Sequence, residues 1–90
     1  MSVKINIPIF LQSLTNNVKV AKVTGSTIGE CIDDFIKQFP GIEKELFDKD
    51  GNLHYHLTVW INRESTSPDM MAKTINDGDE LDIIRLHMGG

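Results

Sequence analysis

Residues 80–86 read Glu-Leu-Asp-Ile-Ile-Arg-Leu, an apolar and partly β-branched run near the end of the sequence. Such a composition is typical of a strand. The preceding residues 76–79 read Asn-Asp-Gly-Asp, which is a strong turn signal. The sequence finishes shortly after the run, at Gly89 and Gly90. We therefore expect a final strand that holds the end of the chain in register with the fold.

The two last glycines have a chemical consequence. Glycine lacks a side chain, so its backbone can pass through a channel too narrow for other residues. The carbonyl carbon of Gly90 is likewise unshielded from a nucleophile. Small residues also end many chains without any such role, but here a strand signal lies directly upstream. We expect residues 1–88 to form one domain and residues 89–90 to form a flexible tail that serves as a chemical handle.

The upstream segments indicate a hairpin followed by a helix. Residues 3–7 and 18–23 alternate apolar and polar side chains, which is the period of a strand. Asn16 and Asn17 between them favour a turn. Residues 27–39 open with a Thr-Ile-Gly-Glu capping box and carry apolar residues at helical spacing. The apolar positions of this helix are Ile28, Cys31, Ile32, Phe35, Ile36 and Phe39.

The later segments complete an α+β fold. We expect a short helical turn within residues 42–47, a strand over 53–62, a loop over 63–69 and the last strand over 81–86. The helix allows a crossover, and the apolar last strand is suited to a central place beside the first. This arrangement is the β-grasp, with a mixed four- to five-stranded sheet packed on one main helix. The expected core comprises Ile5, Ile7, Val20, Ile28, Ile32, Phe35, Ile36, Leu81 and Ile83.

Composition narrows the function classes. A chain of 90 residues forms one domain, and its 40% hydrophobic and 24% charged residues are ordinary for a soluble protein. The formal net charge of -4 argues against nucleic acid as the main partner. The single cysteine excludes an internal disulfide and a cysteine-based zinc site. No stretch approaches the ~20 apolar residues of a membrane span, and no signal peptide is evident. We therefore expect a cytoplasmic protein without a membrane partner.

Six short motifs resemble the ubiquitin-like sulfur carriers of the MoaD, ThiS and CysO type. They cover nearly the whole chain and lie at residues 7–8, 27–30, 39–42, 59–62, 76–81 and 89–90. The Asp-Gly-Asp-Glu turn before an apolar strand, together with the terminal Gly-Gly, is the most specific part. The long segment 42–54 is closer to the cysteine-biosynthesis carrier than to the short thiamine carrier. The chain departs from the common pattern because residues 85–88 contain no proline.

The resemblance implies a reaction at Gly90. A ubiquitin-activating-type adenylyltransferase and sulfurtransferase would use ATP to adenylate the Gly90 carboxylate. Sulfide or a persulfide would then displace AMP and leave a thiocarboxylate. A sulfur-accepting synthase would take the sulfur, most simply for cysteine, and a metal-dependent peptidase is a further partner that the resemblance admits. The carrier would be a protein substrate and not an enzyme, with no bound cofactor and no metal.

Partner contacts are expected from the end of the final strand, at Ile84, Arg85, Leu86 and Met88. If the odd-numbered residues of this strand face the helix, Ile84 and Leu86 face away from it. An apolar patch beside the tail would then serve as a docking surface, and Arg85 would add a charged contact. The alternative is that the segment 63–75 covers this face.

Other residues suggest weaker hypotheses. His54 and His56 alternate on the expected third strand, but no third ligand accompanies them, so we expect no metal site. Cys31 has the spacing of a core residue. Met70 and Met71 are either adaptable contacts or, as we prefer, loop packing.

Several functions remain open at the level of sequence. The small subunit of molybdopterin synthase is the main alternative among the carriers. A protein modifier that forms an isopeptide bond through Gly90 would use the same activation chemistry. A third alternative is a β-grasp interaction module whose glycines have no chemical role.

Overall fold

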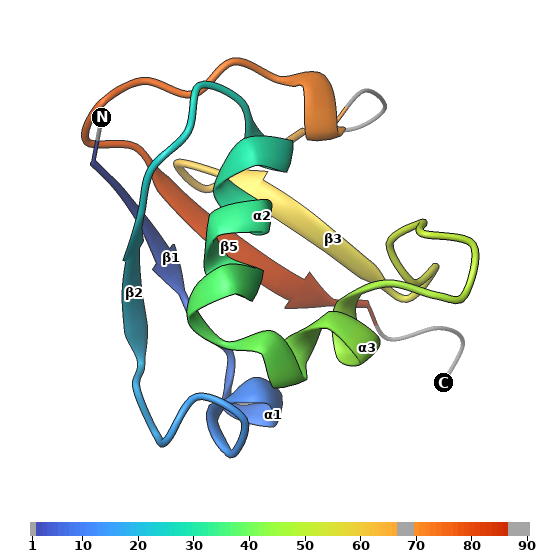
Figure 1. Cartoon of the computed structure of the whole chain (residues 1–90). Helices are drawn as coiled ribbons and strands as arrows, with labels where there is room; N and C mark the ends of the chain where they lie inside the picture. The colour runs from blue at the N-terminus through green and yellow to red at the C-terminus, as the bar shows by residue number, and fades with distance from the viewer. Residues whose placement is uncertain (1, 67–69, 87–90) are drawn as a thin grey trace.

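The computed structural model describes residues 2–66 and 70–86, which form a five-stranded sheet with helix α2 (Ile28–Gln38) against one face (Figure 1). The strands are β1 (Val3–Asn6), β2 (Val20–Val23), β3 (Leu57–Ile61), β4 (Glu64–Ser65) and β5 (Glu80–Arg85). The other helical elements are α1 (Ile9–Gln12), η1 (Pro40–Ile42), α3 (Glu43–Leu46) and η2 (Met70–Ala72). Within these residues no helix is both long and apolar enough to cross a membrane.

The topology confirms the β-grasp. The strand order is β2-β1-β5-β3-β4, so the last strand lies in the middle of the sheet. Strand β5 runs parallel to β1, with Ile5 opposite Leu81, and antiparallel to β3, with Val59 opposite Ile83. The parallel pair requires the crossover that α2 provides. The sheet is therefore mixed, and it fixes β5 on both sides.

The core lies between α2 and the sheet, as the apolar patterns predicted. Seven of the nine expected core residues are buried, namely Ile5, Ile7, Ile28, Ile32, Phe35, Leu81 and Ile83. The expectation for Val20 is wrong, because this residue is 46% exposed. Ala21 and Val23 point inward instead, since Ile5 pairs with Ala21 across the hairpin. Ile36 is only half-buried, at the margin of the core.

Helix α2 begins at the expected capping box. The Thr27 hydroxyl accepts a hydrogen bond from the Glu30 amide at 3.2 Å. The Glu30 carboxylate reaches one residue further than in a standard box and accepts from the Ser26 amide at 2.8 Å. The helix therefore starts where the sequence predicted, and both polar groups at its first turn have partners.

Two expected boundaries are wrong. The predicted strand 53–62 is a strand only over Leu57–Ile61, because the chain before Leu57 forms a turn in which the Leu57 amide donates to the His54 carbonyl at 2.9 Å. The predicted loop 63–69 contains β4, which pairs with β3 through a tight turn. That turn places Asn62 and Arg63 at φ angles of 48° and 69°, the left-handed region in which arginine is uncommon.

Candidate functional site

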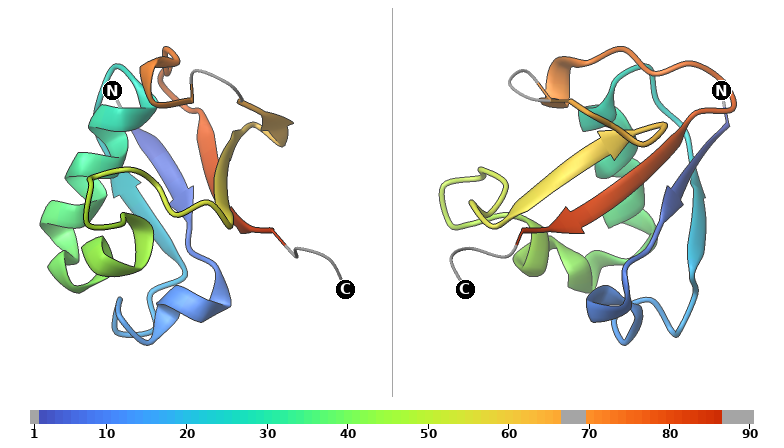
Figure 2. Two further views of the ribbon diagram at one scale, coloured as in Figure 1. Left: turned by 90° about the vertical axis from the view of Figure 1, so that its right-hand side faces the viewer. Right: turned by 180° about the vertical axis from the view of Figure 1, so that it is seen from behind.

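The candidate site is the end of β5, from which the chain leaves the sheet (Figure 2). The odd-numbered residues Leu81 and Ile83 face α2 and are buried, as alternation along a strand requires. Ile84 belongs to the opposite face and is half-buried, and Leu86 is 41% exposed. The strand thus brings two apolar side chains to the surface next to the expected tail.

The described residues of the segment 63–75, namely 63–66 and 70–75, do not cover Ile84. They form β4 at the edge of the sheet and η2, which lies against α2. The Ile28 amide donates to the Lys73 carbonyl at 3.0 Å, which ties the segment to the first turn of α2 (Figure 1). This part of the segment therefore packs on the helix side, away from Ile84.

Arg85 has an intramolecular partner that the sequence did not reveal. Its guanidinium carbon lies 4.5 Å from the ring centroid of Phe10, which is the geometry of a cation–π contact. Phe10 belongs to α1, and the Gln12 side chain fastens that helix by donating to the Ile7 carbonyl at 3.0 Å. The run Ile9-Phe10-Leu11 after Pro8 was the only signal in the sequence, and it did not specify a helix. Arg85 thus connects the end of β5 to α1.

One backbone bond fastens the next residue. The Leu86 amide donates to the His56 carbonyl at 2.7 Å. His56 and His54 lie outside β3, contrary to the sequence-based assignment to a strand, although their rings stack with centroids 5.4 Å apart. Tyr55 between them is 82% exposed. The described residues contain no group of three potential metal ligands.

Three site residues inferred from sequence, Met88, Gly89 and Gly90, lie outside the described residues. Their roles therefore remain predictions. The structure brings Ile84, Arg85 and Leu86 together at the end of the central strand, immediately before them.

The beginning of β5 is fixed by a polar turn. Asp79 accepts hydrogen bonds from the Asn62 side-chain amide at 3.0 Å and from the Asn76 backbone amide at 2.7 Å. These two bonds, that of Asn62 first, hold the pKa of the Asp79 carboxyl below its usual range. Gly78 adopts a φ angle of 89°, which explains a glycine at this position of the turn. The turn that the sequence identified therefore anchors the strand.

Cys31 is a core residue, as its spacing predicted. Its side chain is fully buried on the inner face of α2. Burial, followed by the nearby Asp34 and Glu30 carboxylates, raises the pKa of the thiol. A thiol with a raised pKa is a poor nucleophile at neutral pH, so Cys31 does not belong to the candidate site.

Known proteins similar to this chain identify its class. The chain matches no protein-family model. Its fold aligns with crystal structures of CysO from the Amycolatopsis orientalis BexX/CysO complex and of CysO from Mycobacterium tuberculosis. Both have a TM-score of 0.86 and 30% identity, and they cover 98% and 94% of this chain and 99% of each solved chain. The small archaeal modifier protein SAMP1 from Haloferax volcanii shares the fold, with a TM-score of 0.85, 24% identity and full coverage of both chains. The protein is therefore a ubiquitin-like β-grasp protein.

Relatives in sequence narrow the class to one family. The sulfur carrier proteins CysO of Mycobacterium tuberculosis and Mycobacterium bovis are 31% identical to this chain over 93 aligned residues, which cover both proteins completely. The chain belongs to the family of CysO-type sulfur carriers. The A. orientalis member was solved in a complex with BexX, so a carrier of this type binds a partner protein.

Proposed function

We propose that this protein carries sulfur as a thiocarboxylate on Gly90 and donates it to a sulfur-accepting synthase in cysteine biosynthesis. The observation that carries the proposal is the central position of β5 in a chain of the CysO family. A strand paired on both sides gives the adjoining end of the chain a fixed point of departure, and only five residues separate β5 from that end. The protein is a substrate of its partner enzymes in this proposal and not itself an enzyme.

The proposed chemistry takes place at the terminal carboxylate. A carboxylate oxygen of Gly90 attacks the α-phosphorus of ATP, and the β- and γ-phosphates leave together as pyrophosphate. Hydrosulfide then attacks the acyl carbon, AMP leaves and a proton is released, which gives the thiocarboxylate. A free carboxylate is a poor electrophile, whereas the acyl-adenylate has a good leaving group. The activating enzyme supplies ATP and the catalytic groups, so the carrier binds no cofactor.

The end of β5 supports docking of that enzyme. In this proposal Ile84, which is half-buried, and Leu86, which is 41% exposed, belong to an apolar docking surface beside the tail that Met88 would extend. Exposed apolar side chains that cluster on a small protein mark interaction surfaces. Arg85 is exposed, and its guanidinium, which lies over the Phe10 ring, would be available to an acidic partner surface on the side that the ring does not cover.

Intact mass spectrometry tests the proposal. The protein is incubated with the organism's own activating enzyme, magnesium ATP and sulfide, and the expected result is a mass gain equal to replacement of one oxygen by sulfur. Deletion of Gly90 should abolish this gain, and Gly90→Ala should slow it, because the activating site must accept a backbone without side chains. Gly41→Ala is the matched control, since a Cβ at Gly41 meets no atom within 4 Å.

Two outcomes would redirect the proposal. A wild-type protein that gains no sulfur but appears in lysine-linked conjugates is a modifier. A thiocarboxylate that forms but passes its sulfur only to a molybdopterin synthase large subunit, and not to a cysteine-forming synthase, assigns the protein to the molybdenum cofactor pathway.

A further inference from the structure

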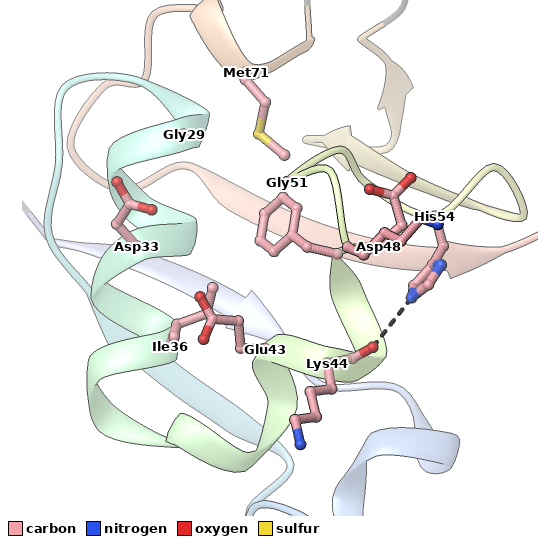
Figure 3. A pocket seen from close by; sticks show the side chains of 11 residues that line it. Gly29, Asp33, Ile36, Glu43, Lys44, Asp48, Gly51, His54 and Met71 are labelled. Atoms are coloured by element: carbon pink, nitrogen blue, oxygen red, sulfur yellow. Dashed lines mark hydrogen bonds between the residues drawn. The ribbon is translucent and has the colours of Figure 1, made fainter.

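A groove of about 1050 Å³ lies on the helix side of the molecule, between α2 and the segment that contains α3 (Figure 3). Its apolar lining consists of Ile36, Phe47 and Met71, which are all half-buried. A second, smaller cavity of about 390 Å³ shares Phe47 and Met71 with it and continues toward η2. The groove combines an apolar floor with charged margins, and it is separate from the sheet face that carries Ile84.

The walls of the groove are held by backbone bonds. On one side the Phe47 amide donates to the Glu43 carbonyl at 2.9 Å, and the His54 amide donates to the Leu46 carbonyl at 2.9 Å. On the other side Gly29 allows η2 to approach α2, because a Cβ there would lie 3.1 Å from the Met71 carbonyl oxygen. These backbone bonds connect the loop after α3 to α3 and bring η2 close to α2 on the two sides of the groove.

The charges around the groove are unevenly distributed. Asp33 on α2 and Glu43 at the start of α3 are exposed and both line the groove, and Asp48 lies on the opposite side of it from Asp33 (Figure 3). The Asp48 carboxylate accepts the amides of Asp50 and Asn52 at 2.9 and 3.1 Å.

The groove lining also contains basic groups. Lys44, Lys49 and His54 belong to it, and the His54 ring contacts the Lys44 carbonyl at 3.1 Å. The side chain of Lys44 extends away from Asp33 in Figure 3. Asp33 and Glu43 thus give the groove two exposed carboxylates from which the Lys44 side chain is directed away, and the protein as a whole carries a net charge of -4.

We propose that this groove binds a partner protein through a segment that combines an apolar side chain with an arginine. The arginine would lie between Asp33 and Glu43, with its guanidinium plane against the ring of Phe47. The apolar side chain would fill the space beside Met71, whose flexible thioether adapts to different shapes. Complementary charge selects the partner, and the apolar surface adds affinity.

The groove would allow the protein to bind a second partner at the same time as the first. The groove lies on the α2 side of the sheet, whereas Ile84 belongs to the opposite face. One partner can therefore hold the groove while another protein contacts the end of β5. The inference does not rest on sulfur transfer, and its test needs no activating enzyme.

The test is a titration of the full-length, ¹⁵N-labelled protein with two blocked peptides, one alternating leucine and arginine, the other alternating leucine and glutamate. We expect the basic peptide alone to shift the amide signals of Asp33, Ile36 and Glu43. The double variant D33N/E43Q should bind it about fivefold more weakly, since two exposed charge pairs are lost. The matched control E45Q/D50N removes two carboxylates outside the groove lining and should leave the affinity unchanged.

Several results would overturn the inference. Equal weakening in the two double variants would show attraction by net charge alone. Equal binding of the acidic peptide, or signal changes confined to Val20 and Ile84, would place the interaction elsewhere. Absence of binding by the basic peptide at millimolar concentration would also contradict it. All the substituted side chains are exposed, so unchanged spectra of the free variants would show that the fold is intact.

Discussion

The two ends of strand β5 are held in different ways. At its start, the Asp79 carboxylate accepts bonds from Asn62 and Asn76, and the Asp79 carbonyl accepts the Lys4 amide at 3.1 Å. At its other end, the Leu86 amide donates to His56, and Arg85 lies on an aromatic ring. Hydrogen bonds at the start of β5 thus connect it to β1 and to the turn that follows β3. The other end of β5 leaves apolar side chains exposed.

The start of β5 therefore contributes mainly to the stability of the fold, whereas its other end exposes side chains that a partner can contact. The turn before β5 also reaches the N-terminal segment, because the Gly78 amide donates to the Ser2 carbonyl at 2.8 Å and the Ser2 amide donates to Asp77 at 2.6 Å. Changes at this end should therefore lower the free energy of unfolding. Changes at the other end should alter what the protein contacts, with little effect on folding.

The largest effect is expected from Asp79→Ala at the anchored end. The substitution removes both side-chain hydrogen bonds of the turn, and we expect a loss of about 1–2 kcal/mol in the free energy of unfolding at neutral pH. Urea titration followed by circular dichroism measures this loss. Asp50→Ala, an exposed aspartate in the turn at residues 48–52, is the control.

The pH dependence of that loss tests whether the two hydrogen bonds are made to the ionised form of the Asp79 carboxyl. The pKa of the Asp79 carboxyl is lowered in the folded protein. Its stabilising contribution is therefore complete above the unfolded pKa of about 3.9, and it disappears as the pH falls through the folded pKa. The difference between wild type and Asp79→Ala should thus be full at neutral pH and should decrease as the pH falls below about 4. A difference that stays constant across this range would show that the bonds do not favour the ionised carboxylate.

A smaller effect is expected where Arg85 meets Phe10. An exposed cation–π contact contributes about 0.5–1 kcal/mol. Phe10→Leu also removes packing, because the ring is partly buried. A double-mutant cycle with Arg85→Met isolates the coupling between the two side chains. Additive losses would mean that Arg85 is free to contact a partner and that α1 does not hold the end of β5.

The main helix and the central strand could be predicted from the sequence because the apolar residues of each follow one dominant pattern. Helix α2 has a single apolar stripe and a capping box, and β5 is a strong apolar run directly after a turn. Segment 18–23 contains two competing alternations, one with Val20 and one with Ala21 and Val23. The pairing of Ile5 with Ala21 decides between them, and pairing is not visible in a single sequence.

Features that depend on tertiary contacts were missed for the same reason. The length of β3 is limited by the turn at residues 54–57, in which the Leu57 amide donates to the His54 carbonyl, and not by its own composition. The contact between Phe10 and Arg85 joins residues 75 positions apart, and the groove lined by Phe47 and Met71 needs three separate segments. Sequence reasoning placed Ile84 on the outer face correctly, because strand alternation is a local rule.

The smallest effect on folding, and the most selective effect on function, is expected from Leu86→Asp. Its side chain is 41% exposed, so the free energy of unfolding should change by less than about 0.5 kcal/mol. The hydrogen bond that fastens this residue runs from its backbone amide to His56 and does not involve the side chain.

Association with the activating enzyme should nevertheless weaken at least about tenfold, because a charge would replace an apolar contact at the centre of the expected interface. Leu14→Asp is the matched control, since Leu14 is 38% exposed and lies in the turn after α1. Surface plasmon resonance with the activating enzyme immobilised measures both variants. If Leu86→Asp binds like wild type, the end of β5 only positions the tail and the docking surface lies elsewhere. If Leu14→Asp weakens binding equally, the interface extends over α1, and the contrast between the two ends of β5 no longer defines it.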